Sequence, residues 1–118
     1  MADLLVCTSC HPGKAVAFIA RLAQALPDFQ VGGTTCMSGC IRPGTIAFRG
    51  TGKASYLFGD IDPDGPIADI VTFGRLYADI PDGWIEDARS LGNLRTRAIA
   101  RIPVGPDAPT VANGLTIP

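Results

Sequence analysis

The chain has 118 residues, of which 47% are hydrophobic and 18% are charged, so it has the size of one domain with its own core. Its 10 Lys and Arg residues nearly balance its 11 Asp and Glu residues, which argues against a nucleic-acid or polybasic membrane binder. With no apolar run of about 20 residues to span a bilayer and no signal-like N-terminus, we expect a soluble cytoplasmic protein.

The first predicted elements are a strand and a helix on either side of two cysteines. A short apolar strand over residues 3–6 runs directly into Cys7, and residues 11–13, after Cys10, suit a turn and a helix start. Apolar residues at helical spacing then define the inner face of a helix: Ala15, Phe18, Ile19, Leu22 and Leu26, with Pro27 ending it. The helix dipole and backbone N–H groups at such a position favour thiolates or an anionic cluster.

Three further strands are predicted next. Residues 30–35 form the first and lead into Cys36-Met-Ser-Gly-Cys40. Residues 45–48 and 55–58 form the other two, and the turn signals in residues 50–53 predict that they pair as a hairpin.

A second helix is predicted after an acidic turn over residues 60–66, with Asp62 or Gly65 as its cap. Its inner face carries Ile67, Ile70, Val71, Gly74 and Tyr77, and residues 81–83 end it. Residues 98–103 are one more extended segment. The order β-α-β then β-β-α predicts an α/β, thioredoxin-like domain over residues 1–103, with two main helices on a small mixed sheet. Residues 104–118, rich in Pro and Gly, are predicted to be a loose tail.

The four cysteines form two close pairs, Cys7 with Cys10 and Cys36 with Cys40, separated by 25 residues. In a reducing compartment this spacing predicts a metal site in which two loops each supply two thiolates. Four incidental buried thiols are the simpler alternative. The spacing alone does not choose between zinc and an iron–sulfur cluster, because both accept four thiolates.

The motifs Cys7-Thr-Ser-Cys10 and Cys36-Met-Ser-Gly-Cys40, each after a predicted strand, resemble those of the thioredoxin-like 2Fe–2S ferredoxins. More closely, the chain resembles a family of short bacterial predicted metal-binding proteins, domain of unknown function 1636. The segments that carry this resemblance are residues 56–63, 73–77, 81–83 and 98–103. The resemblance covers residues 3–103 and leaves the tail out.

The resemblance implies a 2Fe–2S cluster held by Cys7, Cys10, Cys36 and Cys40, and one-electron transfer to or from a redox partner protein, a reductase or an acceptor enzyme. It also implies a homodimer and a link to cobalamin-related metabolism. Two features depart from the family pattern. The first cysteine pair is closer together than is common, and residues 42–45 lack the further cysteine that relatives often carry. Four thiolates remain, which is enough to hold the cluster.

Three functions compete on this evidence. An electron carrier uses all four cysteines, and eight of the eleven acidic residues lie between Asp60 and Asp87, where they either steer a basic partner or form an ordinary solvated surface. A structural zinc protein uses the same four thiolates, although a chain with two helices and a sheet has less need of zinc to fold. A thioredoxin-like dithiol oxidoreductase uses Cys7 and Cys10 and leaves the other pair unexplained.

The remaining chemistry-bearing residues favour structural roles. His11 is predicted to be a loop residue or a hydrogen-bond donor near the site rather than a ligand. The aromatic residues Tyr56, Tyr77 and Trp84 are predicted to be buried or partly buried. Four arginines near the C-terminus are predicted to pair with the acidic segment, within or between subunits: Arg89, Arg95, Arg97 and Arg101. With one His in the chain and no nucleotide loop, Ser/His/Asp set or paired carboxylates, we do not expect an enzyme unless it works through the cysteines.

Overall fold

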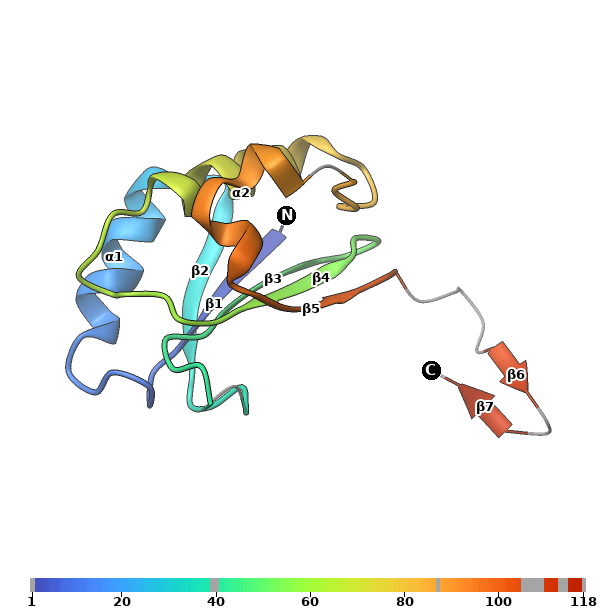
Figure 1. The fold of residues 1–118 in the computed structure, drawn as a ribbon, viewed down its shortest axis with the longest axis horizontal. Coiled ribbons are helices and arrows are strands. Elements are labelled where there is room, and N and C mark those ends of the chain that lie inside the picture. Colours follow the sequence, from blue (N-terminus) through green and yellow to red (C-terminus); the bar gives the residue numbers. More distant parts are fainter. Residues whose placement is uncertain (1, 39–40, 87, 105–109, 113–114, 118) are drawn as a thin grey trace.

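The computed structural model describes residues 2–38, 41–86, 88–104, 110–112 and 115–117. Its elements follow in the order β1 (Ala2–Cys7), α1 (Ala15–Ala25), β2 (Phe29–Thr34), β3 (Ile46–Gly50), β4 (Ser55–Phe58), α2 (Ala68–Asp79), η1 (Ala88–Thr96), β5 (Ala98–Ile102), β6 (Thr110–Ala112) and β7 (Leu115–Ile117) (Figure 1). The predicted order β-α-β then β-β-α is confirmed, and so is the extended segment that became β5.

Five strands form one mixed sheet in the order β2-β1-β3-β4-β5. β1 and β2 are parallel, with Cys7 opposite Thr34, and the other neighbours are antiparallel. β3 and β4 form the predicted hairpin. Because parallel strands end at the same edge of a sheet, the two loops that carry the cysteine pairs leave the sheet side by side.

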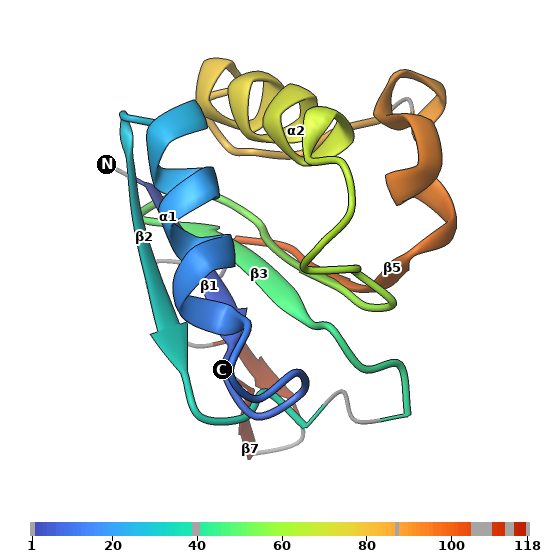
Figure 2. The same cartoon turned by 90° about the vertical axis from the view of Figure 1, so that its left-hand side faces the viewer.

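The helices α1 and α2 and the 3₁₀ segment η1 all lie over one face of this sheet (Figure 2). Between them and the strands is an aromatic core centred on Phe48. Its ring lies 4.6 Å from that of Phe73, 5.7 Å from those of Phe29 and Tyr77, and 6.3 Å from that of Phe58. Ring pairs at such distances add to the stability from burial, so the core holds the strands independently of the cysteines.

The first helix agrees with its prediction. Phe18 and Leu22 are buried on its inner face, and the Leu26 N–H donates to the Leu22 carbonyl just before Pro27, which cannot continue the helix. Of the predicted core aromatics, Tyr56 and Tyr77 are buried and Trp84 is half-buried.

The predicted caps of the second helix are wrong. α2 begins at Ala68, and no side chain bonds to its N-terminus. The Asp62 carboxylate accepts a hydrogen bond from the Asp64 N–H at 2.9 Å instead, so Asp62 closes a local turn several residues earlier. Gly65 lies in the same stretch before the helix.

The segment η1 was not predicted. It is kinked at Gly92, whose φ is 60°, and a Cβ at that position would lie 2.6 Å from the Asp69 carboxylate. That carboxylate accepts a hydrogen bond from the Asn93 N–H at 3.1 Å. Asp69 of α2 therefore caps the second half of η1, and the buried Leu91 and Leu94 attach η1 to the core.

The opposite face of the sheet carries a half-buried apolar row. The strand register places Leu5, Ala47, Leu57 and Ala100 side by side across β1, β3, β4 and β5. The helices in the described part of the chain leave this face uncovered (Figures 1 and 2).

Two features concern the rest of the chain. β6 and β7 pair with each other as a hairpin in their own two-stranded sheet, which the prediction of a loose tail did not include; the domain boundary after residue 103 stays a prediction. No helix in the described residues has the length and apolar character needed to cross a membrane.

Candidate functional site

The first cysteine pair lies where β1 ends. Cys7 is the last residue of β1 and is buried, and Cys10 follows in the loop before α1, half-buried. The Cys10 thiol donates to the Cys7 Sγ, with the two sulfurs 3.1 Å apart. The prediction that a strand end and a helix start flank this pair is confirmed, and the two thiols lie close enough to act on one centre.

The loop after β2 lies against this pair. The Thr8 N–H donates to the Thr34 carbonyl at 2.8 Å, and the Cys7 thiol is 3.7 Å from the Thr35 carbonyl. Thr35 is the residue directly before Cys36. The backbone of the second cysteine motif therefore starts beside the first pair, as the parallel register of β1 and β2 requires.

The second cysteine pair is described in part. Cys36 is exposed, and its Sγ accepts a hydrogen bond from the Ser38 N–H at 3.3 Å. Ser38 has a φ of 61°, which turns the loop. Cys40 lies outside the described residues. Within the residues that are described, no three His, Cys, Asp or Glu side chains converge as a metal site, so the four-cysteine ligand set stays a prediction.

The surroundings of Cys7 favour its thiolate. Burial alone raises the pKa of the Cys7 thiol, but hydrogen bonds with the side chains and backbone of Ser9 and Cys10 lower the pKa by more. The result is a pKa of about 7, compared with the ordinary value of 9.0. The thiolate is the form of cysteine that binds metals and attacks disulfides.

Thr45 connects the site to β3, and sequence reasoning missed it. The Cys7 N–H donates to the Thr45 carbonyl at 3.0 Å, and the Thr45 hydroxyl is 3.5 Å from the Cys10 Sγ. Thr45 is a polar residue that is fully buried, with 1% of its surface exposed. Thr45 was predicted as the first residue of a strand, which gave no signal of this role, because only the fold brings it against the cysteines.

His11 and Cys7 line the same narrow, mostly apolar pocket, which Phe18 and Ile61 close from the side of the core. The position is compatible with the predicted role of His11 as a residue near the site. Its role stays a prediction.

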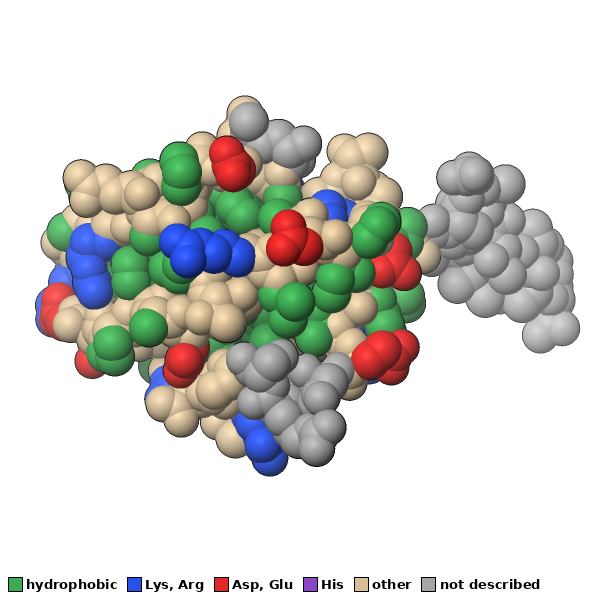
Figure 3. Space-filling model, turned by 90° about the horizontal axis from the view of Figure 1, so that it is seen from above, with side chains coloured by type: hydrophobic (Ala, Val, Ile, Leu, Met, Phe, Trp, Pro, Cys, Tyr) green, Lys and Arg blue, Asp and Glu red, His purple; other side chains and the backbone are tan. Residues whose placement is uncertain are grey.

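The acidic stretch before α2 is largely paired within the chain. Asp64 forms an ion pair with Lys14, and Asp60 forms one with Arg42 at 2.7 Å. On the helical side of the molecule, acidic and basic side chains are interspersed over the described surface rather than gathered by sign (Figure 3). This arrangement favours the solvated-surface interpretation of the acidic residues over a patch that steers a basic partner.

Two of the four C-terminal arginines, Arg97 and Arg101, bind the acidic segment as predicted, but through its backbone. Arg97 donates to the Asp60 carbonyl, and Arg101 donates to the Ile85 carbonyl at 3.0 Å and stacks on Trp84 at 3.7 Å. These two arginines bind backbone oxygens of the acidic segment instead of its carboxylates. The Arg89 side chain lies outside the described residues, and pairing between subunits stays a prediction.

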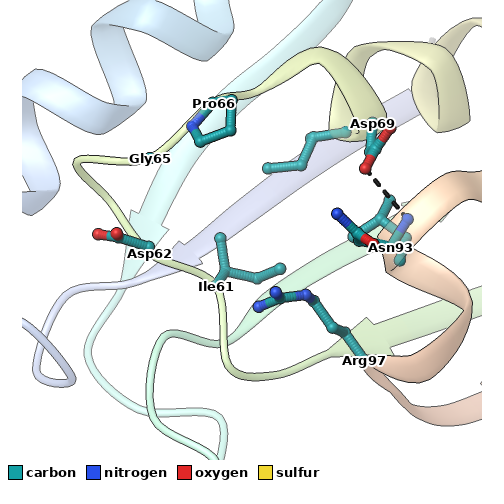
Figure 4. Close-up of a pocket in the computed structure, with 9 residues that line it drawn as sticks. Ile61, Asp62, Gly65, Pro66, Asp69, Asn93 and Arg97 are labelled. Atoms are coloured by element: carbon teal, nitrogen blue, oxygen red, sulfur yellow. Dashed lines mark hydrogen bonds between the residues drawn. The ribbon is translucent and has the colours of Figure 1, made fainter.

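A second pocket, of about 90 Å³, lies between the start of α2 and η1 (Figure 4). Its polar lining groups bind within the chain: Asp69 accepts from the Asn93 N–H, Asp62 accepts from the Asp64 N–H, and Arg97 donates to a backbone carbonyl. None of the described residues that line the pocket is a cysteine. Its small volume and its satisfied polar groups indicate a packing gap between elements rather than a second functional site.

Comparison with known families and structures now bears on this site. The family described as "Protein of unknown function (DUF1636)" matches residues 4–104. The chain belongs to this family. The match covers the cysteine motifs, the sheet and both helices, and it confirms the resemblance to domain of unknown function 1636. No curated protein matches the chain.

Two solved structures share the fold. A thioredoxin-like 2Fe–2S ferredoxin from Aquifex aeolicus is 14% identical, with a TM-score of 0.52 over 86% of this chain and 92% of its own. A cysteine-to-serine variant of the thioredoxin-like 2Fe–2S ferredoxin from Aquifex aeolicus is 12% identical, with a TM-score of 0.52 over 85% of this chain and 99% of its own. This DUF1636 protein therefore has the thioredoxin-like α/β fold.

Proposed function

We propose that this protein is a one-electron carrier of the ferredoxin kind, with a 2Fe–2S cluster held by Cys7, Cys10, Cys36 and Cys40. The observation that carries the proposal is the convergence of the Cys7 and Cys10 thiols at 3.1 Å, directly beside the loop that leads to Cys36. The fold shared with thioredoxin-like 2Fe–2S ferredoxins supports it.

The donor chemistry of these residues fits the cluster. Four cysteine thiolates are the ligand set of a 2Fe–2S cluster, and the described part of the site already brings one pair together. When bound, the cluster accepts and releases one electron. Its potential is set by burial and by N–H donors to sulfur, and the Ser38 N–H beside the Cys36 Sγ is one such donor on this chain.

The chain's residues hold the first two thiols in place before any metal arrives. The Thr45 carbonyl fixes the Cys7 backbone, and the hydrogen bonds from Ser9 and Cys10 favour the Cys7 thiolate. Ligands that need little rearrangement lose little conformational entropy on binding. We infer that Cys7 and Cys10 would need little rearrangement to act as ligands, and that Cys36 and Cys40 would complete the ligand set.

The variant Cys7→Ser/Cys10→Ser tests the proposal. After reconstitution with iron and sulfide, the wild-type chain should carry about two irons and two sulfides, and the double variant should carry neither. Far-UV circular dichroism should show the same fold in both, because the aromatic core does not involve the cysteines. A double variant that keeps a full-strength cluster spectrum contradicts the ligand assignment, and a wild-type chain that holds about one zinc instead supports a structural zinc site.

We propose three further properties that rest on the family resemblance: a homodimer, a redox partner protein and a link to cobalamin-related metabolism. The uncovered apolar row formed by Leu5, Ala47, Leu57 and Ala100 supports a homodimer, because a second copy would bury this row. Light scattering on the wild-type chain and on Leu57→Glu tests it. A dimer that becomes a monomer in the variant supports the proposal, and a wild-type monomer contradicts it.

The geometry of the first pair also favours a second candidate, a dithiol oxidoreductase. The Cys7 thiolate would attack a substrate disulfide and expel one substrate thiolate, and the Cys10 thiolate would then attack the mixed disulfide. The products are a Cys7–Cys10 disulfide and a substrate that has gained two electrons. The 3.1 Å separation of the sulfurs supports this reaction. Reduction of insulin disulfides by metal-free protein tests it, with Cys10→Ser as the variant that should accumulate the mixed disulfide.

A further inference from the structure

Arg42 binds three acceptors on a distant part of the chain. Its Nε donates to the Asp60 carboxylate at 2.7 Å, one Nη donates to the Thr96 carbonyl at 2.9 Å, and the other to the Ala98 carbonyl at 3.4 Å. Arg42 follows Cys40 by two residues. Its guanidinium therefore connects the segment after the second cysteine pair to the junction of η1 and β5.

The backbone of Asp60, whose carboxylate Arg42 binds, is held by contacts with Arg97. Asp60 has a φ of 57°, its carbonyl accepts from Arg97, and the neighbouring Gly59 N–H donates to the Arg97 carbonyl at 2.8 Å. A Cβ on Gly59 would lie 2.8 Å from the Arg42 Cβ and carbonyl oxygen. The fold therefore places the Asp60 carboxylate within hydrogen-bond distance of Arg42, whose backbone packs against Gly59.

Backbone hydrogen bonds connect the segment that Arg42 anchors to the first cysteine pair. The Asp60 N–H donates to the Arg42 carbonyl at 3.4 Å, and the Ile61 N–H donates to the Gly44 carbonyl at 3.0 Å. One residue further, the Thr45 carbonyl accepts from the Cys7 N–H. The segment 42–45 therefore extends from the second cysteine motif to the backbone of Cys7, and Arg42 is its side-chain anchor.

We propose that Arg42 is a positioning residue: it anchors the segment 42–45 and so holds the Thr45 carbonyl and hydroxyl against Cys7 and Cys10. This inference rests on the proposed function, since it assigns a residue that prepares the same four-cysteine site. A guanidinium is required because its planar fork reaches three acceptors at once, whereas the single ammonium group of Lys cannot match that geometry. The contact is two-thirds shielded on the Arg42 side, where 33% of the side chain is exposed.

The test measures the zinc affinity of the metal-free full-length chain by competition with a chromophoric chelator, and the rate at which a reconstituted cluster is lost to a chelator. Arg42→Gln should lower the zinc affinity and speed cluster loss by about 10-fold, the lower end of the effect of removing a group that hydrogen-bonds a metal ligand, because Arg42 acts through the backbone of residues 42–45. Arg42→Lys should restore little of the loss, because the charge returns without the fork. Urea unfolding on the same samples measures the stability of each variant.

The matched control is Arg101→Gln, which removes an arginine of the neighbouring strand β5 that also binds a backbone carbonyl but faces Trp84. It should lower stability to a similar extent while leaving zinc affinity and cluster loss within twofold of wild type. Equal effects of Arg42→Gln and Arg101→Gln on zinc affinity would overturn the inference and leave the proposed function standing. A wild-type chain that binds neither zinc nor a cluster would overturn both.

Discussion

Gly44→Ala should disrupt the candidate site through a backbone collision. Gly44 has a φ of 82°, and a Cβ there would lie 2.0 Å from the Ile61 carbonyl oxygen, closer than atoms can approach. The left-handed backbone alone costs about 1–2 kcal/mol for Ala, partly offset by about 0.4–1 kcal/mol through the less flexible unfolded chain. The collision also breaks the hydrogen bond from the Ile61 N–H to the Gly44 carbonyl and strains the one from the Asp60 N–H to the Arg42 carbonyl. Each of these hydrogen bonds contributes about 0.5–1.5 kcal/mol to stability. We expect a total loss of about 2–4 kcal/mol.

Gly52→Ala is the matched control, because Gly52 has a φ of 71° but a Cβ there would meet nothing within 4 Å. It should lower the free energy of unfolding only by the net cost of placing Ala in a left-handed backbone, about 1 kcal/mol. Urea unfolding followed by far-UV circular dichroism and Trp84 fluorescence measures both variants. If the two variants lose the same stability within about 0.5 kcal/mol, the segment 42–45 is not packed as described, and its role in holding the first cysteine pair is refuted.

Two other predictions concern Tyr77 and Lys53, near the end of the sheet opposite to the cysteines. Burial, followed by the charges of Tyr56 and Asp3, raises the pKa of Tyr77 to about 12, so its neutral hydroxyl stabilises the fold below pH 10 and this contribution is lost as the pH rises from about 10 to about 12. Tyr77→Phe should lower the free energy of unfolding by about 1–3 kcal/mol at pH 7, because the Ala54 carbonyl loses the Tyr77 hydroxyl that donates to it at 2.5 Å. Above pH 10 the stability of the variant should fall less steeply with pH than that of wild type, and equal slopes would contradict this. Lys53→Met should lower the free energy of unfolding by about 1–2 kcal/mol, because the Lys53 ammonium caps carbonyls at the C-terminal end of α2. It donates to the Tyr77 carbonyl at 2.9 Å and to the Ile80 carbonyl at 2.6 Å. An unchanged urea midpoint would show that this cap contributes nothing.

The regular elements could be predicted from the sequence because each has a local signal. Apolar residues at helical spacing between Ala15 and Leu26 defined α1, and β4 matched its predicted range of residues 55–58. The segment η1 was not predicted because a single pair of buried apolar residues, Leu91 and Leu94, is too short a pattern to define a helix face. Its cap comes from Asp69 on another helix, which no local pattern reveals.

The candidate site could be predicted only in part. The spacing of Cys7 and Cys10 between a strand and a helix was enough to place them together, since both elements have clear signals. Arg42 and Thr45 lie close to Cys40 along the chain, but their partners Asp60 and Cys10 are more than ten positions away from them, and only the tertiary fold brings these residues together. The sequence alone left two interpretations of the acidic residues open for the same reason, because the ion-pair partners of Asp60 and Asp64 are distant in sequence.

The measurement that tests the central claim most directly is the absorption spectrum of untagged wild-type protein, purified without oxygen, before and after dithionite. Iron, sulfide and zinc are assayed on the same sample. The account predicts red-brown charge-transfer bands that bleach on reduction, with about two irons and two sulfides per chain. A colourless protein without iron, whether it holds zinc or only titratable thiols, would contradict the electron-carrier assignment.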